Sequence, residues 1–116
     1  MMMDLRKALE NEEAFTAMEL MMDGFKPDEN DYRHFTKARG SVANSLSISV
    51  TFERYHSERY NPETEEFYRG TQYFARVQIH RVSWDGDDIE YENNIDVHVM
   101  ADKVMDTLKA FTDMGL

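Results

Sequence analysis

Hydrophobic and polar residues alternate in three segments of the chain, residues 45–52, 72–82 and 88–99. A period of two is typical of a β-strand that buries one face and leaves the other in water. The sequence therefore predicts three strands, joined by hairpins into an antiparallel meander whose apolar faces share one side.

The second hairpin must turn near Asp85 and Gly86. A two-residue turn at this pair would set the apolar face of one strand beside the polar face of its neighbour. A three-residue loop ending at Gly86 keeps the apolar faces together, because a slip of one residue reverses every side chain. This register is predicted, with the pairs Ser83–Asp87, Ile79–Tyr91, Ala75–Ile95 and Tyr73–Val97.

The first hairpin is predicted to turn at residues 61–64, with Pro62 at the second position. The expected pairs are Tyr60–Glu65, Phe52–Tyr73, Val50–Ala75 and Ile48–Val77. The ribbon 54–70 should then project about eight residues, or ~27 Å, beyond the third strand. Since a lone ribbon is marginal in water, it should pack either on residues 25–40 or on another molecule.

Two helices are predicted at residues 12–23 and 101–114 by their helical spacing of apolar residues. Asn11 is the expected N-cap of the first helix, and Gly24 follows its end. Its apolar arc of about 220° exceeds the ~100° that a core-facing helix needs, so it should be enclosed or partly covered by a second chain. Residues 28–39 are a weaker helix candidate, with an irregular loop as the alternative.

The predicted fold is α+β, in the order α(α)βββα. It is a three-stranded antiparallel meander with helices on one face and a long protruding hairpin between its first two strands. At 116 residues the chain should form a single domain, 1–116. It has no cysteine, no apolar run long enough to span a bilayer and no signal-peptide pattern, so a cytoplasmic location is expected.

The formal net charge is −10, from 23 acidic and 13 basic residues. Residues 32–81 nevertheless hold eight of the bases and five of the acids, so two acidic ends flank a mildly basic middle. This balance argues against direct binding of nucleic acid or of a membrane. It favours a basic protein partner.

Carboxylates gather on the polar side of the third strand and on the loop before it. The residues are Asp85, Asp87, Asp88, Glu90, Glu92 and Asp96. Alternate residues of a strand lie about 6.8 Å apart, so such a column could imitate a phosphodiester track. The alternative interpretation is an ordinary solvated sheet face, partly neutralised by Arg76 and His80 on the neighbouring strand.

Two further surfaces are candidates for protein contacts. The hairpin arm carries residue types enriched at interface hot spots, namely Arg54, Tyr55, Arg59, Tyr60, Phe67, Tyr68 and Arg69. The first helix offers an apolar surface for self-association, consisting of Phe15, Met18, Met21 and Met22. Self-association through these two surfaces would suit a homodimer.

No catalytic motif, cofactor motif or metal-ligand spacing is present, so a non-enzymatic protein without cofactor or metal is predicted. The first hypothesis is an acidic inhibitor, in the style of small phage and mobile-element proteins, that occupies a nucleic-acid-binding partner by mimicking DNA. The alternative is a structural or assembly protein that self-associates. The element order is also similar to that of double-stranded-RNA-binding domains, but the closing helix alternates acids and lysines where such domains present lysines to phosphate.

Overall fold

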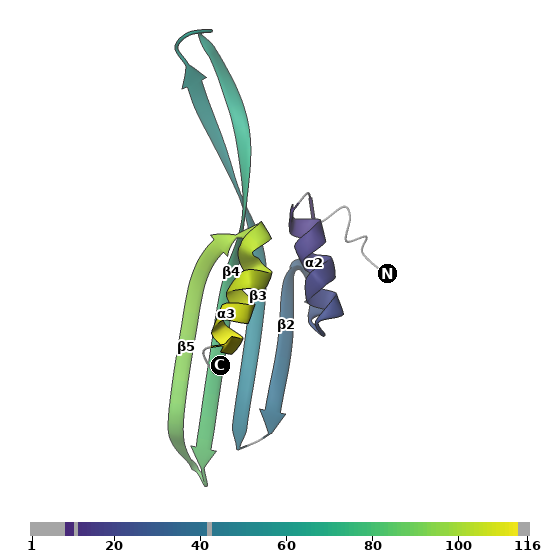
Figure 1. Cartoon of the computed structure of the whole chain (residues 1–116), viewed down its shortest axis with the longest axis vertical. Helices are drawn as coiled ribbons and strands as arrows, with labels where there is room; N and C mark the ends of the chain where they lie inside the picture. The colour runs from purple at the N-terminus through teal and green to yellow at the C-terminus, as the bar shows by residue number, and fades with distance from the viewer. Residues whose placement is uncertain (1–8, 11, 42, 114–116) are drawn as a thin grey trace.

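One meandering antiparallel sheet forms the centre of the molecule in the computed structural model, which describes residues 9, 10, 12–41 and 43–113. Within these residues, the side chains of Ser57, Arg59, Tyr68 and Arg69 are not described. The elements are α2 (Glu12–Met22), β1 (Lys26–Asp28), β2 (Asp31–Ser41), β3 (Asn44–Asn61), β4 (Glu66–Asp85), β5 (Asp88–Met100), the 3-10 turn η1 (Ala101–Lys103) and α3 (Val104–Asp113). The described strands follow the order β1-β2-β3-β4-β5 (Figure 1), which confirms the predicted α+β antiparallel class.

Residues 28–39 were expected to be a helix or a loop, and both expectations are wrong, because this segment forms most of β2. The sheet accordingly has five described strands and not three. On the inner side of β2, Arg33 and Lys37 stand on either side of the fully buried Phe35. Each cation pairs with a carboxylate from α2 or from the residue that follows it. The strand therefore lacks the apolar alternation by which a strand is recognised.

The predicted register of the first hairpin is wrong by two residues. Its four-residue loop is 62–65 rather than 61–64, and Glu65 at its end has a positive φ of 55°. Phe52 consequently pairs with Ala75. Moving a loop by one residue shifts each pair by two, so the same side chains stay on the buried face.

The predicted register of the second hairpin is wrong by four residues. The chain turns through two residues, Gly86 and Asp87, and Gly86 has the positive φ (63°) that the first position of a tight hairpin turn requires. A bulge then leaves Glu90 without a partner in the ladder. The bulge restores the pairing of like faces, since Ile79 lies opposite Ile95 beyond it.

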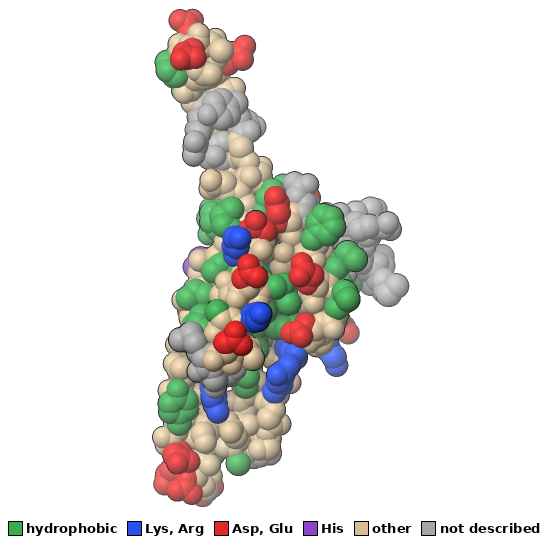
Figure 2. Space-filling model, viewed as in Figure 1, with side chains coloured by type: hydrophobic (Ala, Val, Ile, Leu, Met, Phe, Trp, Pro, Cys, Tyr) green, Lys and Arg blue, Asp and Glu red, His purple; other side chains and the backbone are tan. Residues whose placement is uncertain are grey.

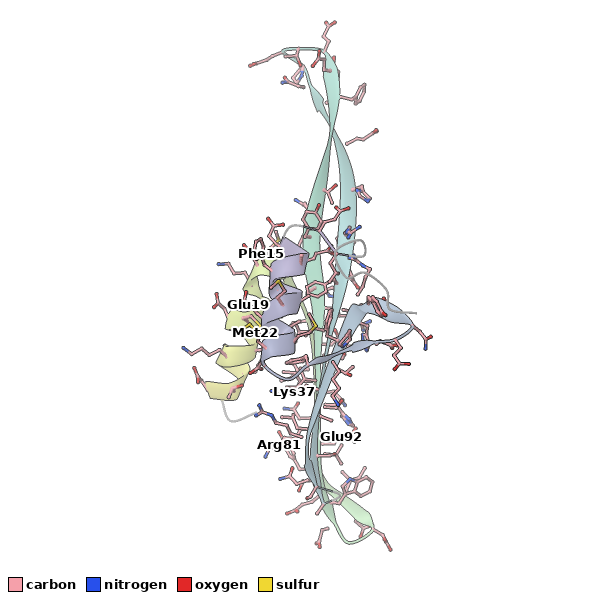
Figure 3. The ribbon with its side chains drawn as sticks, turned by 90° about the vertical axis from the view of Figure 1, so that its right-hand side faces the viewer. Phe15, Glu19, Met22, Lys37, Arg81 and Glu92 are labelled. Atoms are coloured by element: carbon pink, nitrogen blue, oxygen red, sulfur yellow. The ribbon has the colours of Figure 1, made fainter. Side chains whose placement is uncertain are left out.

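Helices α2 and α3 lie side by side against one face of the sheet (Figures 1 and 3). The predicted sharing of one apolar face by the strands is confirmed, because the core lies between this face and the helices. Its buried residues are Leu9, Ala17, Leu20, Phe25, Phe35, Val50, Phe52, Ala75, Val77, Ile79, Ala101 and Val104. The predicted cap Asn11 and the end of the closing helix at Met114 lie outside the described residues.

Strands β3 and β4 continue past the rest of the sheet. Strand β2 pairs with β3 only as far as Thr51, and β5 pairs with β4 only as far as Phe74. From there on, residues 54–61 and 66–73 pair with each other alone. This two-stranded segment, residues 54–73, is the hairpin arm, and it projects from one end of the molecule (Figure 1). The longest dimension of the molecule is 66 Å.

Candidate interaction surfaces

The predicted acidic face is divided by the observed register. Glu92 and Asp96 lie on the sheet face opposite the helices, where Asp96 pairs with Arg76 and Glu92 with His80. Arg76 thus partly neutralises Asp96 as expected, while His80 Nε2 lies 3.0 Å from Glu92 Oε1. The other four carboxylates lie elsewhere, at the β4–β5 turn (Asp85, Asp87 and Asp88) and at the bulge (Glu90).

The pair formed by Arg76 and Asp96 alters both groups. Arg76 Nε donates to Asp96 Oδ1 at 2.9 Å, and the guanidinium also contacts Oδ2. This hydrogen bond holds the pKa of Asp96 below its ordinary value, and the carboxylate raises the pKa of Arg76. Asp96 is thus an anion already matched by a cation of its own sheet.

The hairpin arm keeps its aromatic rings in solvent. Tyr60 and Phe67 are 52% and 71% exposed, and their ring centroids lie 5.1 Å apart across the two strands. At the arm's base, Tyr55 packs edge-on against Phe74, and its hydroxyl donates to Glu53, which raises the pKa of Tyr55. No helix lies over the arm in Figure 1. Strand β2, which contains most of residues 25–40, pairs with β3 only between Asn44 and Thr51, outside the arm. The predicted packing of the ribbon on residues 25–40 is therefore wrong.

Three predicted arm residues, Arg59, Tyr68 and Arg69, pair within the ladder, but their side chains are not among those described. A fourth predicted arm residue, Arg54, points toward helix α2. Its guanidinium reaches the fully buried carboxylate of Glu13 on α2, with Nε 2.9 Å from Oε1. Arg54 therefore joins the arm to the body of the protein.

Glu13 is the residue that sequence reasoning missed. Its carboxylate also accepts hydrogen bonds from Arg33 of β2, and the backbone N–H of Glu10 donates to it at 3.2 Å. A buried carboxylate requires such partners, because burial without them costs several kcal/mol. Its position in the helix could have indicated its burial, because residue 13 shares a helix face with the buried Ala17 and Leu20.

Helix α2 exposes three of its four predicted self-association residues. Phe15, Met18 and Met22 are 72%, 59% and 86% exposed and follow one another at helical spacing, whereas Met21 packs against the core. Figure 3 shows Phe15 and Met22 on the same helix, with Glu19 between them. Phe15, Met18 and Met22 are called the α2 stripe below. They account for the excess width of the apolar arc.

The described residues contain no group of three or more His, Asp or Glu side chains arranged to hold a metal ion. None of the described helices combines the length and apolar character needed to cross a membrane. No protein-family model matches the sequence, and comparisons with curated proteins and with solved structures gave no match. The interaction surfaces must therefore be interpreted from their own chemistry.

Proposed function

We propose that this protein is a non-catalytic assembly protein that self-associates through the hairpin arm and the α2 stripe. The observation that carries the proposal is the arm, whose exposed Tyr60 and Phe67 lie on a ribbon that no other element covers in the described chain. A ribbon of two strands is marginally stable by itself in water. Covering it with a neighbouring copy would bury its rings and stabilise it.

The composition of both surfaces supports this proposal. Aromatic residues and methionine are enriched at protein interfaces, and contiguous exposed apolar side chains mark interaction sites. The arm and the α2 stripe belong to different parts of the molecule (Figure 1). Each copy would therefore have two separate contacts, as a dimer with two interfaces or a larger assembly requires.

Mass measurement by light scattering at micromolar concentration tests the proposal. We expect the full chain to exceed the monomer mass of 13.7 kDa. An arm-shortened variant, in which an Asn-Gly turn replaces residues 58–69, should have a lower mass at the same concentration. Ser57 and Gly70 face each other in the ladder, so a tight turn can join them without disturbing the body. A full chain that is monomeric throughout the micromolar range contradicts the proposal.

Met18→Ser with Met22→Ser tests the second surface. Both side chains are exposed, so the fold should tolerate their loss while the mass falls. Ile89→Ser is the matched control, because Ile89 is also half exposed but lies by the β4–β5 turn. An equal loss of mass in the control would show that general surface hydrophobicity, and not the α2 stripe, drives association.

A second candidate is the acidic inhibitor of a nucleic-acid-binding protein. Its support is the net charge of −10 and the exposed acids at the β4–β5 turn, Asp85, Asp87 and Asp88. The pairing of Asp96 with Arg76 weakens the imitation of a continuous phosphate track. Affinity for a basic partner should fall steeply with added salt, whereas self-association through apolar surfaces should not.

A further inference from the structure

The two edges of the sheet differ in how they are closed. Strand β1 pairs with β2 between Asp31 and Thr36, and the inward side of β2 carries the charged side chains of Arg33 and Lys37. A covering strand and inward charges both prevent another chain from pairing with a sheet edge. At the other edge, β5 pairs with β4 alone in the part of the chain that the structure describes. Figure 1 draws β5 as the outermost strand, with neither helix beyond it.

Protection is also uneven along β5 itself. Its first part, residues 88–92, carries Asp88, Glu90 and Glu92 and includes the bulge, and charges and bulges both hinder edge pairing. Figure 2 shows acidic side chains gathered at the end of the molecule where β5 begins. The last part, residues 94–100, follows β4 in regular register to its end and is called the open edge below. Its outward N–H and C=O groups form the kind of row that another strand recognises.

The hydrophobic core extends to the open edge and is not closed there. Ile95, Val97 and Val99 face the helix side, pack against the core and remain only partly buried. At the β2 edge, by contrast, Phe35 is fully buried. A strand that pairs with the open edge must therefore bring apolar side chains at alternate positions on the same face.

A second copy of the open edge meets this requirement. In an antiparallel pair about a twofold axis at Val97, perpendicular to the sheet, Val97 lies opposite its own copy and Ile95 lies opposite Val99. The axis at Val97 also sets Asp96 opposite His98. An axis at Asp96 would instead set two carboxylates opposite each other, which destabilises a strand pair. An axis between two residues would set apolar faces beside polar ones.

The antiparallel arrangement also suits the charges around the open edge. Asp96 and His98 contact Arg76 and Glu53 of their own chain, so the pairing requires no free charge at either residue. The acidic residues 88–92 of each copy extend past the end of the partner's β5, because each strand ends shortly after the axis. A parallel pair would instead place the two acidic parts side by side.

We propose that two copies of the protein pair antiparallel through residues 94–100 of β5, about an axis at Val97, so that their sheets join into one. This contact goes beyond the proposed contacts of the arm and the α2 stripe and involves neither of them. Because both copies contribute the same segment, the pairing closes as a symmetric dimer and does not propagate.

Cysteine cross-linking tests the contact, because the natural chain has no cysteine. Opposite residues of an antiparallel pair have Cα atoms about 4.5–5.5 Å apart, which a disulfide can span. With oxidised glutathione as the oxidant, Val97→Cys should therefore form a covalent dimer of twice the 13.7 kDa chain mass. Val99→Cys is the matched control, because its two copies would lie about 14 Å apart along the strands. Val97→Cys should cross-link at least about tenfold faster than this control.

A mixture of two variants tests the register. Ile95→Cys and Val99→Cys should each remain without a cross-link when alone, but should cross-link when mixed 1:1, since residue 95 of one copy lies opposite residue 99 of the other. Circular dichroism checks that every variant folds. Equal cross-linking of Val97→Cys and Val99→Cys would indicate random collision and overturn the proposal. Absence of a cross-link both in Val97→Cys and in the mixture would also overturn it.

The arm-shortened variant separates this contact from the proposed function. The open edge lies outside the replaced residues 58–69, so Val97→Cys should cross-link equally fast in the shortened chain. Failure of the proposed arm contact would then leave this inference intact. Loss of the cross-link in the folded, shortened chain would overturn β5 pairing as a separate contact.

Discussion

The β3–β4 ladder is continuous, yet its two halves differ in what holds them. In the body, Phe52 is buried at 2% exposure beneath the helices and packs edge-on against Phe35, with ring centroids 5.7 Å apart. In the arm, Tyr60 and Phe67 form a similar cross-strand contact, but both rings remain in water. Backbone pairing is common to both halves, so the difference lies in burial, which supplies most of the stabilising free energy. The arm is therefore the half whose side chains remain available to a partner.

The largest expected effect separates these halves directly. Phe52→Ala should lower the free energy of unfolding by about 3–5 kcal/mol, because it leaves a cavity in the core. Phe67→Ala should lower it by less than about 1 kcal/mol, the scale of one cross-strand pair. Urea denaturation at a concentration where the protein is monomeric measures both. Equal losses in the two variants would mean that the arm is packed like the body.

A smaller effect is expected where the halves meet. Glu13→Ala removes the carboxylate that joins α2 to Arg33 of β2 and to Arg54 at the arm's base. We expect a loss of about 2–3 kcal/mol, below the usual range for a buried pair, because both arginines remain about one-quarter exposed to water. The control is Glu10→Ala, whose half-exposed carboxylate lies 3.7 Å from Arg54 and should contribute under about 1 kcal/mol. A loss as small as that of the control would contradict the structural role of Glu13.

The smallest expected effect concerns the ion pair of Arg76 and Asp96, on the sheet face opposite the helices. Arg76 lowers the pKa of Asp96 in the folded protein, so their pair stabilises the fold above the unfolded carboxyl pKa. That contribution should be lost as the pH falls through the lowered, folded pKa. In Arg76→Gln the pKa of Asp96, followed by NMR, should return toward its ordinary value. An unchanged titration in the variant would contradict the pairing.

The difference between body and arm also explains what the sequence could predict. Burial determines which residues share a face, so the common apolar side of β3, β4 and β5 was predicted correctly. Exact partners depend on turns, and neither the left-handed Glu65 nor the bulge at Glu90 has a signal in the residue pattern. In β2 the pattern failed because Arg33 and Lys37 occupy inward positions and are neutralised by acids far along the chain.

For the arm, the exposed residues Tyr55, Tyr60 and Phe67 were predicted, whereas the contact of Arg54 with α2 was not. Excess apolar width in a helix is visible in its periodicity, so Phe15, Met18 and Met22 could be found. By contrast, a pocket of about 50 Å³ beside Arg39 is formed by residues of β2, β3, β4 and α3 and by Asp23 and Phe25, which follow α2. Its lining becomes continuous only when the register is known.

Hydrogen exchange of the backbone amides, measured at low and at high micromolar concentration, tests the central claim most directly. If the arm is covered by a second copy, amides of residues 54–61 and 66–73 should exchange quickly in dilute protein and more slowly in concentrated protein. Amides of the body around Val50 and Val77 should be protected equally at both concentrations. Arm amides that exchange at one unchanged rate, while the mass rises with concentration, would contradict the account.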